Sequence, residues 1–288
     1  MGQGKSNPIG GTAVYKGDNS GRGPSPGLWG NLFNKFAEFD YAYGDLMAEN
    51  FLSFGGLVAT NVGQYAGHSG SFYSFEDTGG SIKMLATEIG GVVRLLTPAT
   101  DNKEAWMQAG GLTTVQTKLD DSSGNRNRVR FEARLRMSSI ADTVFGWFCG
   151  LAEEGSALEN FIADAGTLVD KDLIGFFRPE GDGDGIDIVH QKAGGGLITV
   201  QADAVVPVVN TFVKLGFDFN FLDSDGPSIR YFANGVQVAR FALTAGDPPT
   251  FPATFPDAEE LAFIAGLKTA AGTASSLDLD WAFLFTDR

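Results

Sequence analysis

Three runs of the sequence alternate between apolar and polar residues, and this pattern constrains the fold more than any other feature. They are 128–137 (RVRFEARLRM), 211–221 (TFVKLGFDFNF) and 276–285 (SLDLDWAFLF). Successive side chains of a β-strand point to opposite faces, so a period of two predicts a long strand with one face on a core. The predicted core faces hold Val129, Phe131, Ala133, Leu135 and Met137; Leu215, Phe217, Phe219 and Phe221; and Leu277, Leu279, Trp281, Phe283 and Phe285.

The opposite faces of two of these runs carry complementary charges. Asp278 and Asp280 lie on the non-core face of 276–285, and four arginines surround Glu132 on the non-core face of 128–137. If the two strands are neighbours, Asp–Arg pairs across them account for both sets. Two alternatives remain open: an arginine ladder that grips a polyanion, and a pair of glycosidase carboxylates at positions 278 and 280.

Shorter β-strands are predicted through the rest of the chain. Asn234-Gly235 joins two β-rich runs and suits a type I′ hairpin turn, because both positions of that turn need a positive φ. Other β-rich segments lie at 51–58, 71–77, 81–86, 91–97, 104–110, 143–151, 172–178, 186–191, 197–202 and 261–268. Only 156–166 predicts a helix, since three apolar residues recur at helical spacing behind Ser156, and 246–256 predicts a proline-rich surface loop. The sequence therefore predicts an all-β, antiparallel sandwich.

The first 44 residues differ from the rest and predict an extended N-terminal arm, followed by one β-domain at 45–288. The arm is rich in Gly, Pro, Asn and Ser, yet it contains isolated large apolar residues. Such a composition suits a segment that lies across a partner's surface. We expect the binding residues to be Pro24, Pro26, Leu28, Trp29 and Phe33. The alternative is that Trp29 packs back onto its own β-domain.

Charge and cysteine content limit the partners and the chemistry. The formal net charge of −14 argues against nucleic acid or an anionic membrane as the main partner. No apolar run reaches the roughly 18–20 residues that cross a bilayer. The single cysteine, Cys149, excludes an internal disulfide, and its apolar surroundings predict a buried thiol rather than a nucleophile.

An acidic stretch at 180–190, EGDGDGIDIVH, has two interpretations. Asp182, Asp184 and Asp187 offer oxygens that calcium prefers, but the stretch lacks the distal glutamate of an EF-hand loop. The favoured interpretation is a hairpin turn whose glycines supply positive φ. The two histidines, His68 and His190, do not form a metal-binding spacing. The sequence therefore predicts no metal and no cofactor.

Residues 50–288 resemble the concanavalin A-like (laminin-G-type) jelly roll. The resemblance rests on RFEARLRM…VFGWFCGLAEE, on KLGFDFNF…SIRYFANGVQVARF and on the closing SLDLDWAFLFTDR. It implies a jelly-roll sandwich. Some jelly rolls of this type are glycan hydrolases, but the E-x-D-x-x-E pattern of laminarinase-like enzymes does not occur in this sequence. We therefore expect no enzymatic activity.

A second, narrower resemblance concerns GPSPGLWGNLF (23–33) and ENFLSFGG (49–56), which look like the start of bacteriophage virion proteins with a jelly roll behind a Gly/Pro-rich arm. It implies a capsid decoration (cement) protein on the virion surface, bound to the major capsid protein and to neighbouring copies of itself as a homo-oligomer. The alternatives are a carbohydrate-binding module of a head or tail fibre, with a glycan ligand, and, third, a glycan hydrolase.

Overall fold

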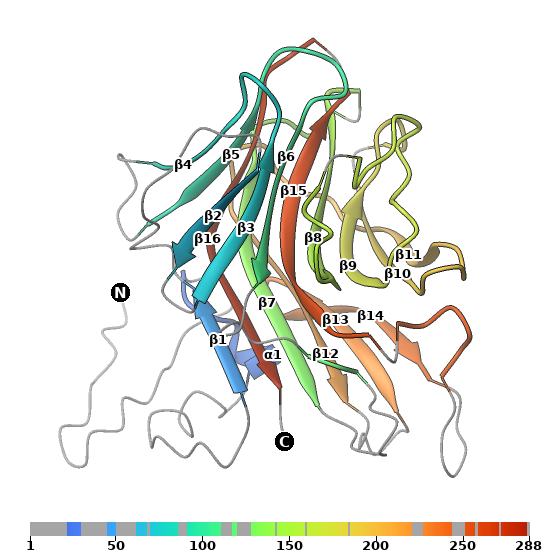
Figure 1. The fold of residues 1–288 in the computed structure, drawn as a ribbon. Coiled ribbons are helices and arrows are strands. Elements are labelled where there is room, and N and C mark those ends of the chain that lie inside the picture. The colour runs from blue at the N-terminus through green and yellow to red at the C-terminus, as the bar shows by residue number, and fades with distance from the viewer. Residues whose placement is uncertain are drawn as a thin grey trace, which may run out of the picture.

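The computed structural model describes residues 22–29, 45–49, 62–67, 70–85, 91–110, 117–119, 128–141, 143–158, 160–183, 185–220, 227–243, 251–256, 259–270 and 272–286. Within these ranges the chain forms two eight-stranded sheets stacked as a sandwich (Figure 1). Every pairing between the named strands is antiparallel. The predicted antiparallel sandwich is confirmed.

Strands from both ends of the chain meet in each sheet. The first sheet contains, in order, β14 (Val236–Ala242), β13 (Ser228–Ala233), β12 (Val213–Asn220), β7 (Val129–Met137), β16 (Ser275–Thr286), β5 (Val93–Thr97) and β4 (Ser81–Met84), and β1 (Asp45–Glu49) pairs with β16. The second sheet contains β11 (Ile198–Val205), β10 (Ile186–Gln191), β9 (Leu173–Arg178), β8 (Phe145–Glu153), β15 (Leu261–Thr269), β6 (Glu104–Gly110), β3 (Gly70–Glu76) and β2 (Val62–Gly67).

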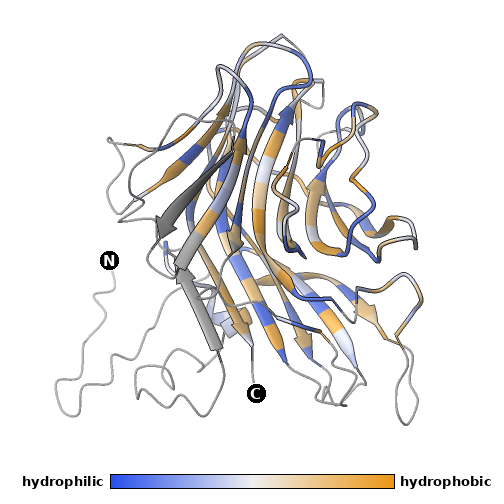
Figure 2. Cartoon of the chain, viewed as in Figure 1, coloured by the Kyte–Doolittle hydropathy of each residue, from blue (hydrophilic) through white to orange (hydrophobic). Residues whose placement is uncertain are grey.

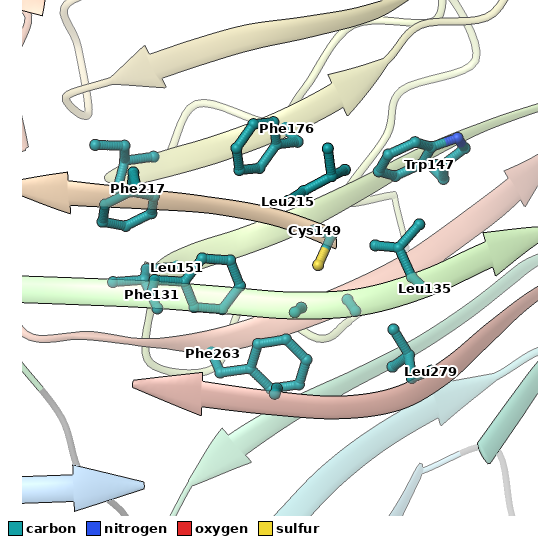
Figure 3. Close-up of a cluster of buried hydrophobic side chains, with 14 of the residues drawn as sticks. Phe131, Leu135, Trp147, Cys149, Leu151, Phe176, Leu215, Phe217, Phe263 and Leu279 are labelled. Atoms are coloured by element: carbon teal, nitrogen blue, oxygen red, sulfur yellow. The ribbon is translucent and has the colours of Figure 1, made fainter. Parts of the chain in front are cut away.

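The main core lies between the two sheets and is built from the alternating strands. Figure 2 shows the alternation as hydrophobic and hydrophilic bands along the strands. Phe131 of β7 packs against Phe217 of β12 and Phe263 of β15, with ring centroids 5.4 and 5.9 Å apart (Figure 3). Cys149 of β8 is buried in the same cluster, as predicted. Burial raises the pKa of this thiol above its ordinary value.

Strand β16 departs from its predicted pattern, because its core face changes halfway along. The register with β7 shifts between Leu279 and Trp281, which is a β-bulge. A shift of one residue moves every later side chain to the opposite face. Beyond the bulge Ala282 and Leu284 lie in the core. The prediction of a single core face was therefore wrong for three aromatic residues that lie outside the core: Trp281, Phe283 and Phe285.

The predicted turns are confirmed where the structure describes them. Asn234 and Gly235 have φ values of 48° and 74° and join β13 to β14. Strands β9 and β10 form an antiparallel hairpin, and Gly181 and Gly183 in the acidic turn between them have φ values of 81° and 90°. The segment predicted at 51–58 lies outside the described residues, and β1 and β2 were not predicted.

The predicted helix at 156–166 does not form. Residues 154–158 and 160–172, which we call the covering loop, follow β8 and precede β9 in the sequence, and they run across the outer face of the second sheet. Ser156 N and Ala157 N donate hydrogen bonds to Gln108 Oε1, at 2.8 and 3.2 Å, rather than entering a helix. Asn160 has a φ of 65°, outside the helical region. Burial against the sheet thus outweighs the helical spacing.

No helix in the described part of the chain is long and apolar enough to cross a membrane.

Candidate partner-binding segment and the polar faces of the sandwich

Residues 22–29, which we call the strap, fold onto the outer face of the first sheet. The strap contains one helical turn, α1 (Pro26–Trp29). Proline suits the first position of a helix, because its fixed φ is helical and its missing N–H would have no partner there. Leu28 N and Trp29 N both donate to Ser25 O, at 3.1 and 3.0 Å.

Glu132 of β7 is the main polar contact of the strap. Its Oε2 accepts hydrogen bonds from Trp29 Nε1 at 2.7 Å and from Ser25 N at 2.9 Å. Burial raises the pKa of Glu132, and the hydrogen bonds from Ser25 and Trp29 act in the opposite direction. On the neighbouring strand β12, Lys214 Nζ donates to Gly23 O at 2.9 Å. The strap therefore covers charged groups on the outer face of the sheet and forms hydrogen bonds with them.

The N-terminal end of the strap is held by Asp280, at the bulge in β16. Arg22 Nε donates to Asp280 Oδ2 at 2.9 Å, and Arg134 of β7 forms an ion pair with the same carboxylate. Trp281 Nε1 donates to Arg22 O at 2.6 Å. The bulge thus places the Asp280 carboxylate and the Trp281 indole N–H side by side. Arg22 binds the carboxylate through its side chain and the indole N–H through its carbonyl oxygen.

The apolar side of the strap forms a small cluster of its own. Leu28 and Trp29 are buried against Phe232 and Phe285, and the half-buried Phe283 packs on the same group. The rings of Trp29 and Phe283 meet edge to face, with centroids 6.1 Å apart. This cluster is separate from the main core between the sheets.

These contacts place four of the five predicted partner-binding residues. Leu28 and Trp29 are buried in their own chain, which is the alternative arrangement considered for Trp29, and Pro24 and Pro26 are half-buried. Phe33 lies outside the described residues. Contact of these residues with a partner stays a prediction. In this arrangement the side chains of Leu28 and Trp29 already pack within their own chain.

The rest of the same face carries a network of ion pairs. Asp278 of β16 binds Arg94 of β5, with Nε and Oδ1 2.6 Å apart, and Arg136 of β7, with Nε and Oδ2 2.8 Å apart. Asp218 of β12 accepts a two-pronged hydrogen bond from Arg128 at 2.8 and 2.7 Å. The expected Asp–Arg pairing across neighbouring strands is confirmed. The arginines and carboxylates of this network neutralise one another.

A second buried charge cluster lies where the covering loop meets the second sheet. Lys268 Nζ of β15 lies 3.2 Å from Glu104 Oε1 of β6 and 2.6 Å from Asp164 Oδ1 of the loop. Trp106 Nε1 and Asn160 N donate to Glu104 Oε2 at 3.0 and 2.8 Å. Burial raises the pKa of Glu104 to about 7, although the charge of Lys268 acts to lower it. These polar contacts fix the covering loop on the sheet.

The acidic stretch at 180–190 contributes a hydrogen bond within the chain. Asp187 Oδ1 accepts a hydrogen bond from Asp203 N at 2.9 Å. Burial raises the pKa of Asp187, and the charges of Asp182 and Asp203 raise it further. Among the residues that the structure describes, no group of three or more His, Cys, Asp or Glu could hold a metal ion. Asp184 and His68 lie outside those residues.

His190 of β10 lies in an aromatic environment. Its ring centroid is 4.8 Å from that of Phe241 and 5.4 Å from that of Phe255, and the side chain is fully buried. Burial lowers the pKa of His190 to about 4. Within the described part of the chain, neither ring nitrogen has a hydrogen-bond partner. Phe255 belongs to the segment predicted as a surface loop, so part of that prediction was wrong.

Comparison with known proteins identifies the fold. The sequence matches no protein family and no curated protein. Peanut lectin bound to a nine-residue peptide is similar in structure, with a TM-score of 0.50 and 14% identity over 85% of this chain and 98% of the lectin. Arcelin-5, a lectin-like defence protein of Phaseolus vulgaris, has a TM-score of 0.49 and 10% identity over 86% of this chain and 100% of its own. An endo-β-1,4-glucuronan lyase from Trichoderma reesei has a TM-score of 0.48 and 6% identity over 84% and 95%. The chain has the concanavalin A-like jelly-roll fold of the lectins.

Proposed function

We propose that the protein is a virion structural protein that decorates a capsid, with the jelly roll as its displayed body and the N-terminal residues as its attachment. The proposal rests on the resemblance of 23–33 and 49–56 to phage virion proteins. It is supported by one structural observation, the ion pairing of five acids of the strands, which favours binding over turnover.

The observation concerns five buried or half-buried acids of the strands. Each has an arginine or lysine nitrogen within 4.0 Å: Glu104, Glu153, Asp218, Asp278 and Asp280. Glycoside hydrolysis uses two carboxylates that flank the scissile bond, about 5–5.5 Å apart in retaining enzymes. Acids that are paired in this way with cations of their own chain are not free to flank a substrate.

The covering loop supports the same conclusion for the second sheet. Phe161, Ile162 and Leu168 of the loop pack onto Trp106 and Phe148, so this part of the outer face is an interior surface. The ring centroids of Trp106 and Phe161 are 4.8 Å apart. A polysaccharide cannot lie on that part of the sheet unless the loop is displaced.

Attachment is tested by co-sedimentation with assembled capsids that lack the protein. The full chain should sediment with capsids, and a variant that lacks residues 1–44, and with them all five predicted binding residues, should lose binding while the sandwich still folds, because the main core does not include the strap. Failure of the full chain to sediment with capsids would overturn the proposal. A reducing-sugar assay on β-glucans, run in parallel, should show no release.

A carbohydrate-binding role is the second candidate, and one side chain favours it. Tyr73 of β3 is 37% exposed although its neighbours in the strand, Phe72 and Ser74, are buried. An exposed aromatic ring with a polar tip can stack on a sugar and donate a hydrogen bond. A glycan array with the full chain, repeated with Tyr73→Ala, separates the candidates: capsid decoration predicts no glycan signal that depends on Tyr73.

A further inference from the structure

We propose that the outer face of the first sheet is a peptide-binding site, and that its ligand is the strap of a second copy of this chain as well as the chain's own. Copies would then be linked by exchange of residues 22–29. This inference goes beyond the proposed function, because it concerns binding between copies whatever else the protein binds.

The first argument is that the outer face of the first sheet presents polar groups whose contacts the strap completes. Glu132 is 1% exposed with the strap in place, and both hydrogen bonds to its Oε2 come from strap atoms. Asp280 is also 1% exposed in this arrangement, and it pairs with Arg22 of the strap as well as with Arg134. An empty site therefore offers a strap two charge-assisted hydrogen bonds and an ion pair.

The second argument is that the strap recognises the face through several chemically distinct contacts. Arg22 pairs with a carboxylate, Gly23 O accepts from an ammonium group, and the Trp29 indole both donates to Glu132 and packs on Phe283. Leu28 lies over Gly216, where an added Cβ would be only 2.7 Å from Leu28 Cδ2. These contacts depend on the sequence of the strap and not on whether the strap belongs to the same chain or to a second copy.

The third argument is that the main core does not include the strap. Leu28 and Trp29 form their cluster with Phe232 and Phe285 on the outside of the sheet, whereas the main core lies between the sheets. Loss of the strap removes an outer layer and leaves the contacts between the sheets in place. The strap can thus leave and rebind without unfolding of the sandwich.

The chain length permits exchange. Residues 30–44 join the strap to β1, and a chain of that length spans at most about 50 Å. A tethered ligand occupies its own site at an effective concentration on the order of 1 mM, so an isolated chain binds its own strap. Binding of a neighbour's strap competes with binding of the chain's own strap when the neighbour's strap is present at a similar local concentration, as in an ordered array of copies.

The test uses full-length chains and a fluorescent synthetic peptide of residues 20–31. Trp29→Ala weakens the chain's own strap and vacates the site, so this variant should bind the peptide at least tenfold more tightly than the wild-type chain does. A peptide that carries Trp29→Ala should not bind. Because Trp29→Ala can also lower stability, Arg22→Glu is the second variant; it repels Asp280 and changes a side chain that is 44% exposed.

Exchange between copies is then tested by complementation. A tagged Trp29→Ala chain has an intact site and a defective strap, and an untagged Glu132→Leu chain has an intact strap and a defective site. The tagged chain should capture the untagged one, and neither variant should capture itself. Folded variants that bind no peptide would overturn the peptide site. Peptide binding without capture would overturn exchange between copies. Neither result depends on a capsid.

Discussion

Acidification should weaken the fold through His190, and the effect can be sized from the structure. The unfolded chain binds a proton at a histidine with a pKa of 6.5, whereas burial lowers the pKa of folded His190 to about 4. Each unit of difference corresponds to about 1.4 kcal/mol, so neutral His190 accounts for about 3 kcal/mol of stability that depends on pH. This stability is fully present above pH 6.5 and is lost as the pH falls from there through 4.

Other groups titrate in the same range with the opposite sign, so the measurement must isolate His190. Burial raises the pKa values of Glu104, Glu132 and Asp187. An acid with a raised folded pKa stabilises the fold as the pH falls. The informative quantity is therefore the difference between the wild-type chain and a variant without the imidazole, measured at two pH values.

His190→Leu is that variant, because leucine fills a similar volume between Phe241 and Phe255 and does not titrate. The free energy of unfolding in urea should be higher for the variant by about 1–3 kcal/mol at pH 7, since two buried ring nitrogens without partners among the described residues are removed. At pH 4 the advantage should grow by about 3 kcal/mol. Parallel pH profiles of the two chains would refute the assignment.

Three further outcomes are expected. Asp218→Ala should lower the free energy of unfolding by about 3 kcal/mol, because it leaves several arginines without their shared carboxylate. The control Glu260→Ala breaks an exposed pair with Lys118 and should lower it by less than about 1 kcal/mol, so equal losses would contradict the difference in burial. Trp29→Ala should lower the free energy of unfolding by about 3 kcal/mol, and Tyr73→Ala, at an exposed position, should lower it by much less. An unchanged melting temperature for Trp29→Ala would mean that the strap is not docked. EDTA should leave the melting temperature unmoved if the acidic turn is only architecture, and a calcium-dependent rise of several degrees would contradict that interpretation.

The sequence predicts the sandwich well where one physical rule decides the structure. In β7 and β12 the period of two continues from end to end, and the core residues follow it. Asn234-Gly235 sets its hairpin because few other residues accept two successive positive φ values. The pairing of Asp278 with an arginine of β7 also follows the sequence, since cross-strand neighbours on the outer face of a sheet are stabilised by opposite charge.

The sequence predicts less where two rules compete. In β16 the aromatic residues continue the alternation past Leu279, and only the register with β7 reveals that the bulge has reversed the faces. In 156–166 the helical spacing is real, but Phe161 and Ile162 gain more by burial on the second sheet. The docking of the strap was predicted only as the alternative for Trp29, because its partners Glu132 and Asp280 are more than a hundred residues away in the sequence.

The bulge in β16 has a consequence for the order of events during synthesis. A ribosome completes β7 long before it makes Asp280 and Trp281, so the strap is made early and its site exists only after the last described strand has emerged. Strand β16 also lies between β7 and β5, so the first sheet stays open until then. Domains form as units once their strands are available, and long-range pairing is slow. Docking of Arg22 and Trp29 therefore comes last, and a protected Trp29 marks a chain whose synthesis and folding have both reached β16.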